Sequence, residues 1–343
     1  MTMRIGLIGG GNISETHARA AKAIPGVQIA AAYGANREKV ERMAARYGAA
    51  AYLDFEEFLA HRPMEFVAIG SPSGLHAEQG IASARHGLHV LTEKPLDIST
   101  RAADALIEAT ANAKVKLGVF FQDRFKVDLL RVKEWINDGI LGKPILADAR
   151  VKWYRSPEYY GDSKWRGRLA LDGGGALTNQ AIHTVDLLLW LYGDVVRVQA
   201  QKKTALHKIE AEDTLTALLE FANGATGVLQ ATTSVYPGYP RRVELTGEQG
   251  TIIIEHDRLV AADLKNPPVD AGGSGDDKNQ SASSATVSDV RGHQAAIEDF
   301  LHAIAQNCEP RCNGVEGRRS VALVEAIYAA CEAGGKVDVK AGR

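Results

Sequence analysis

The chain has 343 residues, of which 45% are hydrophobic and 24% are charged, with a formal net charge of −2. Its length exceeds the usual size of one domain, so we expect two. The near-neutral charge argues against a nucleic-acid or membrane partner, and no apolar run approaches the ~20 residues of a membrane span. Three cysteines without a spaced partner set, and no signal-like leader, lead us to expect a cytoplasmic protein.

The first 121 residues alternate short apolar runs with amphipathic segments. The strand-like runs are 4–9, 27–33, 66–70, 89–92 and 116–121, and the helix-like stretches include 15–23, 38–47 and 100–113. This alternation is typical of a parallel sheet that is covered by helices on both faces. We therefore predict an α/β, doubly wound, dinucleotide-binding domain over residues 1–121.

Residues 122–343 follow a different pattern. Helical stretches at 129–137 and 182–192 are joined by strand-like segments at 144–154, 215–221, 225–235, 241–247 and 250–256, and two amphipathic helices close the chain at 293–306 and 317–331. This pattern predicts an α+β domain on an open, mainly antiparallel sheet with helices on one face. The polar, low-complexity segment 266–285 is predicted to be a mobile surface loop.

A glycine-rich motif, "GGGNIS" over residues 9–14, follows the first strand and opens a helix. In a dinucleotide site, Gly9 would permit the tight turn and Gly11 would let a pyrophosphate approach the backbone. The amides of Asn12 and Ile13 at the helix start would present partial positive charge to it. Ser14 replaces the third glycine and is still small enough for close packing. The alternative is a glycine turn without a ligand.

The end of the second strand bears on the choice of cofactor. NAD-binding sites normally offer a carboxylate here, but this chain has Gly34 and no acid until Glu38. Asn36 and Arg37 supply an amide and a cation, which suit a 2′-phosphate. We therefore predict NADP in preference to NAD. The alternative is that Arg37 only lies at a solvated helix start.

Two further motifs carry candidate chemistry. Lys94, in "TEKP", follows a strand at the carboxyl edge of the sheet, where ligands bind in this architecture. In "GGGALTNQAIHTVD", residues 173–186, the glycines would let backbone and ligand come close, and Asn179, His183 and Asp186 would share a helix face. Histidine suits proton exchange near neutral pH. The alternatives are a structural histidine or metal ligation by His183 and Asp186, and we predict no metal site.

At these motifs the sequence resembles the glucose-fructose oxidoreductase, inositol dehydrogenase and rhizopine-catabolism (Gfo/Idh/MocA) oxidoreductases. The resemblance spans nearly the whole chain and rests on "GLIGGGNIS", "SPSGLHAE", "EKP", "LDGGGALTNQAIHTVDLLLWLYG" and the two closing helices. It implies a Rossmann domain and, over residues 122–343, a substrate-binding domain whose open sheet forms a homodimer or homotetramer interface. It also implies that Lys94 and His183 are the catalytic pair and that the Lys94–Pro95 bond is cis. The cofactor would be lined by Ser71, Pro72, Leu75, His76, Glu93 and Gln122.

The chain departs from the family pattern at two positions. Many members have aspartate four residues before the histidine, where this chain has Asn179, so we assign Asn179 to hydrogen bonding with substrate. Gln122 stands where asparagine is common, which weakens the case for that cofactor contact.

Together these features predict an NAD(P)-dependent oxidoreductase acting on a secondary hydroxyl, or the matching ketone, of a sugar, sugar derivative or cyclitol. His183 would exchange the hydroxyl proton and Lys94 would stabilise the developing alkoxide while hydride moves to or from the nicotinamide. Two alternatives are a non-catalytic dinucleotide-binding sensor and a redox-assisted glycosidase with tightly held NAD. The candidate substrate-binding residues are Lys94, Arg124, Trp153, Tyr154, Arg155, Trp165, Arg166, Asn179 and His183.

Overall fold

The computed structural model describes residues 2–161, 163, 165–268, 289–340 and 342. The chain divides into two compact units. The first unit comprises Met1–Gln122 and Thr286–Arg318, and the second comprises Asp123–Ala285 and Arg319–Arg343. Among the described residues, no helix combines the length and apolar character that crossing a bilayer requires.

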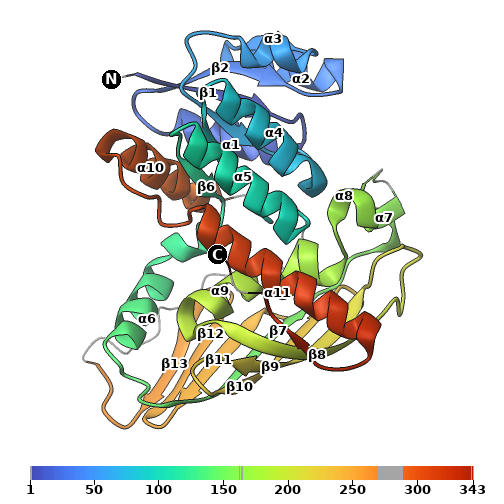
Figure 1. Cartoon of the computed structure of the whole chain (residues 1–343), viewed down its shortest axis with the longest axis vertical. Helices are drawn as coiled ribbons and strands as arrows, with labels where there is room; N and C mark the ends of the chain where they lie inside the picture. The colour runs from blue at the N-terminus through green and yellow to red at the C-terminus, as the bar shows by residue number, and fades with distance from the viewer. Residues whose placement is uncertain (1, 162, 164, 269–288, 341, 343) are drawn as a thin grey trace. The chain divides into compact units, whose positions relative to one another are not determined.

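The first unit is built on a six-stranded parallel sheet (Figure 1). Its strands, in spatial order, are β3 (Ala50–Tyr52), β2 (Val27–Tyr33), β1 (Met3–Ile8), β4 (Phe66–Ile69), β5 (His89–Thr92) and β6 (Leu117–Val119). The order reverses between β1 and β4, and dinucleotides bind at such a switch point in doubly wound sheets. The predicted parallel sheet is confirmed, and only the short β3 was missed.

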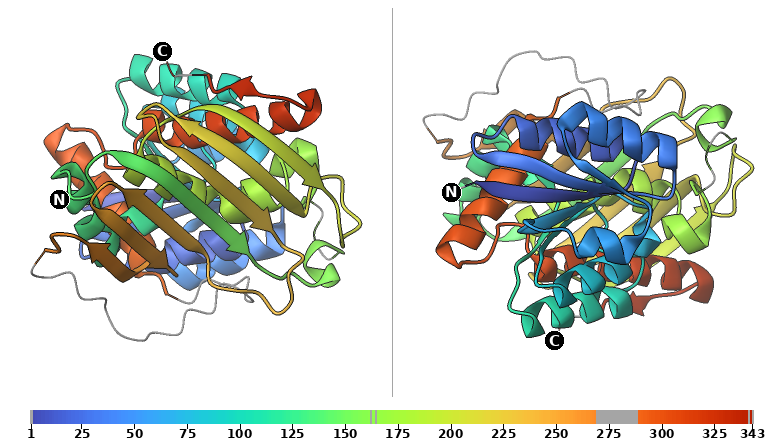
Figure 2. Two further views of the ribbon diagram at one scale, coloured as in Figure 1. Left: turned by 90° about the horizontal axis from the view of Figure 1, so that it is seen from below. Right: turned by 90° about the horizontal axis from the view of Figure 1, so that it is seen from above.

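Helices lie on both sides of this sheet (Figure 2, right). They are α1 (Asn12–Lys22), α2 (Arg37–Tyr47), α3 (Phe55–Leu59), α4 (His76–Arg85), α5 (Thr100–Asn112) and α10 (Arg291–Gln306), with a short 3₁₀ turn, η1 (Ser73–Leu75), before α4. α4 packs against α5, and α1 packs against α10. Burying the strands on both faces explains why they are almost entirely apolar.

The structure corrects the predicted domain boundary near the C-terminus. We expected everything after residue 121 to belong to the second domain, but α10 packs within the first unit. Its fully buried Phe300 lies with its ring 5.9 Å from that of Phe66 and packs closely over Gly118. The apolar stripe of this helix was evident from the sequence, whereas the surface that covers it was not.

The second unit contains an eight-stranded sheet in which β10 and β7 pair in parallel and the other pairs are antiparallel. In spatial order the strands are β13 (Arg258–Leu264), β12 (Gly250–Glu255), β11 (Arg242–Gly247), β7 (Pro144–Lys152), β10 (Thr226–Thr232), β9 (Thr214–Phe221), β8 (Val195–Lys203) and β14 (Val337–Asp338). The predicted open, mainly antiparallel sheet is therefore confirmed. Strands β8, β13 and β14 were not anticipated.

The other elements of the chain are α6 (Val127–Asn137), α7 (Pro157–Gly161), α8 (Leu169–Asp172), α9 (Ile182–Tyr192), α11 (Gly314–Ala333), a 3₁₀ turn η2 (Gln122–Phe125) and a π-helical turn η3 (Ala176–Ala181). α9 packs on β7 and β11, and α6 packs on α9. The opposite face of the sheet is in front in the left view of Figure 2. Exposed apolar residues on its strands include Leu218 of β9 and Val260 of β13. The predicted loop 266–285 lies, from residue 269 onward, outside the described residues.

Candidate active site

The glycine loop after β1 has the shape of an anion-binding turn. Gly9 has φ +117°, and a Cβ at this position would lie 2.7 Å from the carbonyl oxygen of Gly70. Gly11 is the N-cap of α1 and provides no side-chain cap, and a Cβ added there would meet nothing within 4 Å. The first amides of α1, including Asn12 and Ile13, therefore begin an uncapped helix beside open space, which fits a pyrophosphate.

The residues that follow β2 differ from their predicted roles in one respect. The Asn36 side chain caps α2 by accepting a hydrogen bond from the Lys39 amide (3.0 Å). Arg37 is exposed and pairs with Glu41 one turn along (3.0 Å). A Cβ on Gly34 would lie 3.1 Å from Val40, so the position that lacks the acid is closely packed. Asn36 therefore caps α2, whereas the side chain of Arg37 is exposed to solvent.

The loops after β4 and β5 are tied together by His76. Its ring nitrogens lie 2.8 Å from the carbonyl oxygen of Pro95 and 3.0 Å from that of Ser71, and the side chain is buried. The Ser71 hydroxyl donates to Gln79 (2.6 Å). His76 therefore braces the loop that holds Pro72 and Leu75 through two backbone carbonyls, and the lining of the cofactor by these three residues stays a prediction.

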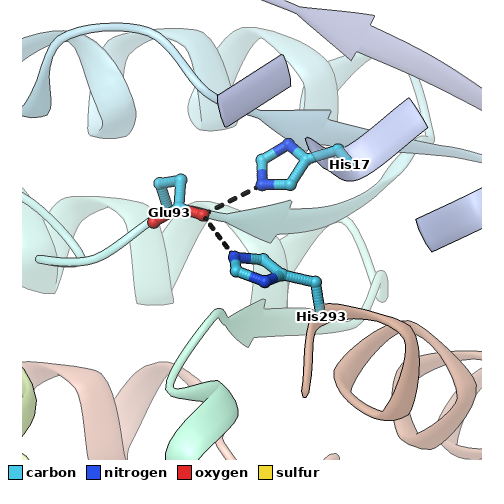
Figure 3. A group of neighbouring side chains, drawn as sticks. All are labelled: His17, Glu93 and His293. Atoms are coloured by element: carbon cyan, nitrogen blue, oxygen red, sulfur yellow. Dashed lines mark hydrogen bonds and ion pairs between the residues drawn. The ribbon is translucent and has the colours of Figure 1, made fainter. Parts of the chain in front are cut away.

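Glu93 is turned into the core of the first unit. Its Oε1 lies 2.9 Å from Nε2 of His17 and 3.5 Å from Nε2 of His293, and all three side chains are buried (Figure 3). Burial raises the pKa of Glu93, but hydrogen bonds and charge from the two histidines outweigh it and hold this pKa well below its usual range. Glu93 therefore links α1, β5 and α10, and its contact with the cofactor stays a prediction.

The ligand atoms of this histidine–glutamate cluster lie within 4.8 Å of one another, close enough to suggest a metal. Imidazoles that bind a metal usually donate from the remaining ring nitrogen to a carbonyl or carboxylate. Nδ1 of both His17 and His293 is buried without a hydrogen-bond partner among the described residues. Hydrogen bonding to Glu93 accounts for the observed contacts, so we interpret the cluster as a structural junction.

Lys94 follows this junction directly. The side chain is half-buried, its backbone N–H donates to Oε2 of Glu93 (3.2 Å), and the bond to Pro95 is cis, as the resemblance implies. Gln122, at the end of the first unit, has a buried Oε1 without a hydrogen-bond partner among the described residues. A buried acceptor of this kind suits a ligand that donates a hydrogen bond to it.

In the second unit, the glycine run has a different cause from the one predicted. A Cβ on Gly175 would lie 1.8 Å from the carbonyl oxygen of Glu212, and one on Gly174 would lie 2.0 Å from the Tyr328 hydroxyl. The Glu212 carboxylate accepts the amides of Gly175 (3.1 Å) and Leu177 (2.9 Å) and the Tyr328 hydroxyl (3.0 Å). The two glycines therefore admit the chain's own backbone and side chains, which corrects the expectation of a ligand.

The segment after the glycines is a π-helical turn that continues into α9, where a regular helix was expected. Such turns are rare and often occur at functional sites. Nδ2 of Asn179 donates to Asp172 (2.7 Å), and Oδ1 accepts from Gln180 (2.8 Å). Asn179 is partly exposed and is held from both ends.

His183 lies in the first turn of α9, and its side chain is 13% exposed. Its Nδ1 lies 3.4 Å from Oδ2 of Asp123, a residue of η2. Asp123 also contacts Arg241 (2.5 Å) and Lys126 (3.4 Å), and both of these cations contact Asp257. An imidazole beside an anion and near the surface is suited to exchanging a proton.

Arg124 forms a buried ion pair within the second unit, and its role in substrate binding stays a prediction. Its guanidinium donates to both oxygens of Asp186 (2.8 and 2.6 Å), and both side chains are buried. A bidentate pair of this kind satisfies the carboxylate and fixes η2 against α9. Asp186 is accordingly engaged by Arg124, which removes the basis for pairing it with His183 as a metal ligand.

The candidate substrate-binding residues between positions 153 and 166 are divided between interior and surface. Trp153 and Arg155 are buried, and Arg155 donates to Gln180 (2.8 Å) while stacking over Trp153 at 5.0 Å. These two residues pack behind the π-helical turn, and their contact with substrate stays a prediction. Tyr154, Trp165 and Arg166 are partly exposed and stay candidates for substrate contact.

Several polar partners of the site were missed from the sequence. Asp123 lies within the quoted "QDRF", but nothing in its local pattern indicated a histidine 60 positions later. Asp172, Gln180 and Glu212 were also missed, and no local signal could have identified them. Lys94 and His183 lie in different units, so their joint action stays a prediction.

Comparison with known proteins gives consistent matches. A family model described as an oxidoreductase family with an NAD-binding Rossmann fold matches residues 3–121, and the GFO/IDH/MocA C-terminal domain matches residues 129–253. Inositol 2-dehydrogenase of Rhizobium meliloti (strain 1021) is 25% identical, covering 95% of this chain and 96% of the relative. Myo-inositol 2-dehydrogenase of Thermotoga maritima is 28% identical, covering 79% and 80%. The crystal structure of the WlbA dehydrogenase from Bordetella pertussis, in complex with NADH and UDP-GlcNAcA, is 31% identical with a TM-score of 0.90, covering 99% of this chain and 98% of that one.

Proposed function

The chain belongs to the Gfo/Idh/MocA oxidoreductase family, and from this premise we propose that it transfers hydride between a nicotinamide dinucleotide and a secondary hydroxyl or ketone of a sugar, sugar derivative or cyclitol. Relatives named as inositol dehydrogenases, and the sugar-nucleotide complex of the WlbA dehydrogenase, support this substrate class. The glycine loop with its uncapped α1, and the orphaned acceptor of Gln122, suit the dinucleotide.

We assign each chemical role to a residue of the chain. The bound dinucleotide supplies the hydride acceptor or donor at its nicotinamide ring. His183 takes the hydroxyl proton as the alcohol is oxidised and returns it in the reverse direction. Lys94 donates a hydrogen bond to the developing alkoxide, and Asn179 holds a neighbouring hydroxyl. Tyr154, Trp165 and Arg166 contact the rest of the polyol through aromatic faces and forked donors.

One observation carries the proposal. The His183 imidazole is only 13% exposed and has a carboxylate 3.4 Å from its Nδ1. Structural histidines in protein cores are also largely buried, but a partly accessible one at the start of a helix, next to an anion and a π-helical turn, is better suited to proton exchange.

The proposal is tested with His183→Ala and Lys94→Met. Each variant should lower kcat by at least about 100-fold on a confirmed substrate, because general acid–base and electrostatic contributions are of this size. Dinucleotide affinity, measured by fluorescence titration, should change little. Near-normal turnover in both variants would show that the assignment is wrong.

We further propose NADP as the preferred cofactor, because Gly34 leaves no carboxylate at the end of β2 and Arg37 supplies a cation at the start of α2. Titration with NADPH and NADH decides between the two. We also propose a homodimer or homotetramer through the open face of the second unit's sheet, supported by the exposed apolar residues Leu218 and Val260 on its strands. A cytoplasmic location is supported by three cysteines that form no disulfide.

A further inference from the structure

Asp123 is a buried anion whose position is fixed by Lys126, three residues further along the chain, and by Arg241 from a distant segment. Arg241 precedes β11, Asp257 lies between β12 and β13, and Lys126 follows η2. Arg241 and Lys126 each contact both carboxylates, so the two negative and two positive charges balance. Because each buried charge has an opposite partner, the Asp123 carboxylate is held firmly in place.

The same network keeps Asp123 ionised. Burial alone raises the pKa of Asp123, but the charges of Arg241, Lys126 and His183 outweigh it and hold this pKa well below its usual range. At neutral pH the group facing Nδ1 of His183 is therefore a carboxylate that only accepts hydrogen bonds. A fixed acceptor at one ring nitrogen selects the imidazole tautomer that carries its proton there.

We propose that Asp123 is a positioning residue for His183, whose Nδ1–H it selects so that Nε2 is the nitrogen that exchanges the substrate proton. This inference rests on the proposed function. The Nδ1···Oδ2 distance of 3.4 Å is longer than an ordinary hydrogen bond, and contacts of this kind often tighten only when substrate is bound. Asp123 acts through His183 and forms no contact with substrate in this scheme.

The Asp123–Asp257 pair offers a matched comparison. Both Asp123→Ala and Asp257→Ala leave Arg241 and Lys126 with one carboxylate, but only the first removes the acceptor next to His183. We expect Asp123→Ala to lower kcat by about 100-fold or more with KM and dinucleotide affinity changed less than about threefold. Asp257→Ala should stay within about tenfold of the wild type. Equal losses of kcat in the two variants would overturn the proposal.

Asp123→Asn keeps the side-chain volume and serves if the alanine variants do not fold. Loss of the negative charge leaves Arg241 and Lys126 in excess near the imidazole, with Asp257 as their remaining carboxylate. The acid limb of the pH profile of kcat/KM should then move to lower pH, because the protonated ring is disfavoured. An unchanged acid limb together with an unchanged kcat contradicts a positioning role.

A readout without substrate separates this inference from the proposed function. Nitrogen NMR of the full-length, histidine-labelled protein, with His183→Gln identifying the signal, reports which ring nitrogen carries the proton. We expect the Nδ1–H tautomer in the wild type and in Asp257→Ala, and its loss in Asp123→Ala. If the wild type shows this tautomer but turns over no polyol or ketose, the proposed function fails while the contact stands. If the tautomer persists in Asp123→Ala, the positioning role is wrong.

Discussion

A side chain at Gly175, in the second unit, would clash with neighbouring backbone. A Cβ added there would lie 1.8 Å from the carbonyl oxygen of Glu212, whereas ordinary contact begins near 3.4 Å. The obstacle is backbone, which cannot rotate away as the end of a side chain would. Gly175→Ala must therefore separate the π-helical turn from the segment before β9 that holds Glu212.

The magnitude follows from what this separation breaks. Overpacking alone destabilises a core by about 1–3 kcal/mol. The displaced segment also loses the hydrogen bonds from the amides of Gly175 and Leu177 to the buried carboxylate and the one from the Ala176 amide to the Glu212 carbonyl oxygen. Hydrogen bonds to charged groups contribute about 1.5–3 kcal/mol each, so we expect a total loss of about 3–5 kcal/mol because partial relaxation will retain some of them.

Urea unfolding monitored by tryptophan fluorescence measures this loss. The matched control is Gly335→Ala in the same unit, because a Cβ there would meet nothing within 4 Å. The control should unfold within about 0.5 kcal/mol of the wild type. If Gly175→Ala unfolds at the same urea concentration as Gly335→Ala, the close approach to Glu212 does not constrain this segment and the reasoning is wrong.

Three further outcomes are expected. Asp186→Asn, which leaves Arg124 buried without its full partner, should lower the free energy of unfolding by about 3–5 kcal/mol in the same urea assay. The pKa of Glu93 in the folded protein is lowered below its ordinary 4.5, so its ionised form stabilises the fold above pH 4.5 and this stabilisation is lost as the pH falls. Glu93→Gln should therefore flatten the dependence of thermal stability on pH below 4.5. Arg37→Ala should weaken NADPH binding several-fold in fluorescence titration and leave NADH binding unchanged; equal effects on both would contradict an NADP preference.

The first unit could be predicted well because its signals are local. Strands buried on both faces are continuous apolar runs, and the turn after β1 needs glycine at a specific backbone angle, φ +117° at Gly9. The same local signals identified α9 and its histidine. They did not indicate that α10 closes the first unit, because an apolar stripe shows that a helix is covered without showing what covers it.

The polar partners around the histidine could not be predicted, because each joins positions that are far apart in the sequence. Gly175 and Glu212 are 37 positions apart, Arg124 and Asp186 are 62 apart, and Arg241 is 118 from Asp123. Residue type identifies a group that is able to exchange a proton, whereas the protonation state and tautomer of that group depend on neighbours that only the fold brings near. The motif therefore predicts the chemistry of His183, and the Asp123 carboxylate, which no motif contains, determines which of its two nitrogens is able to perform it.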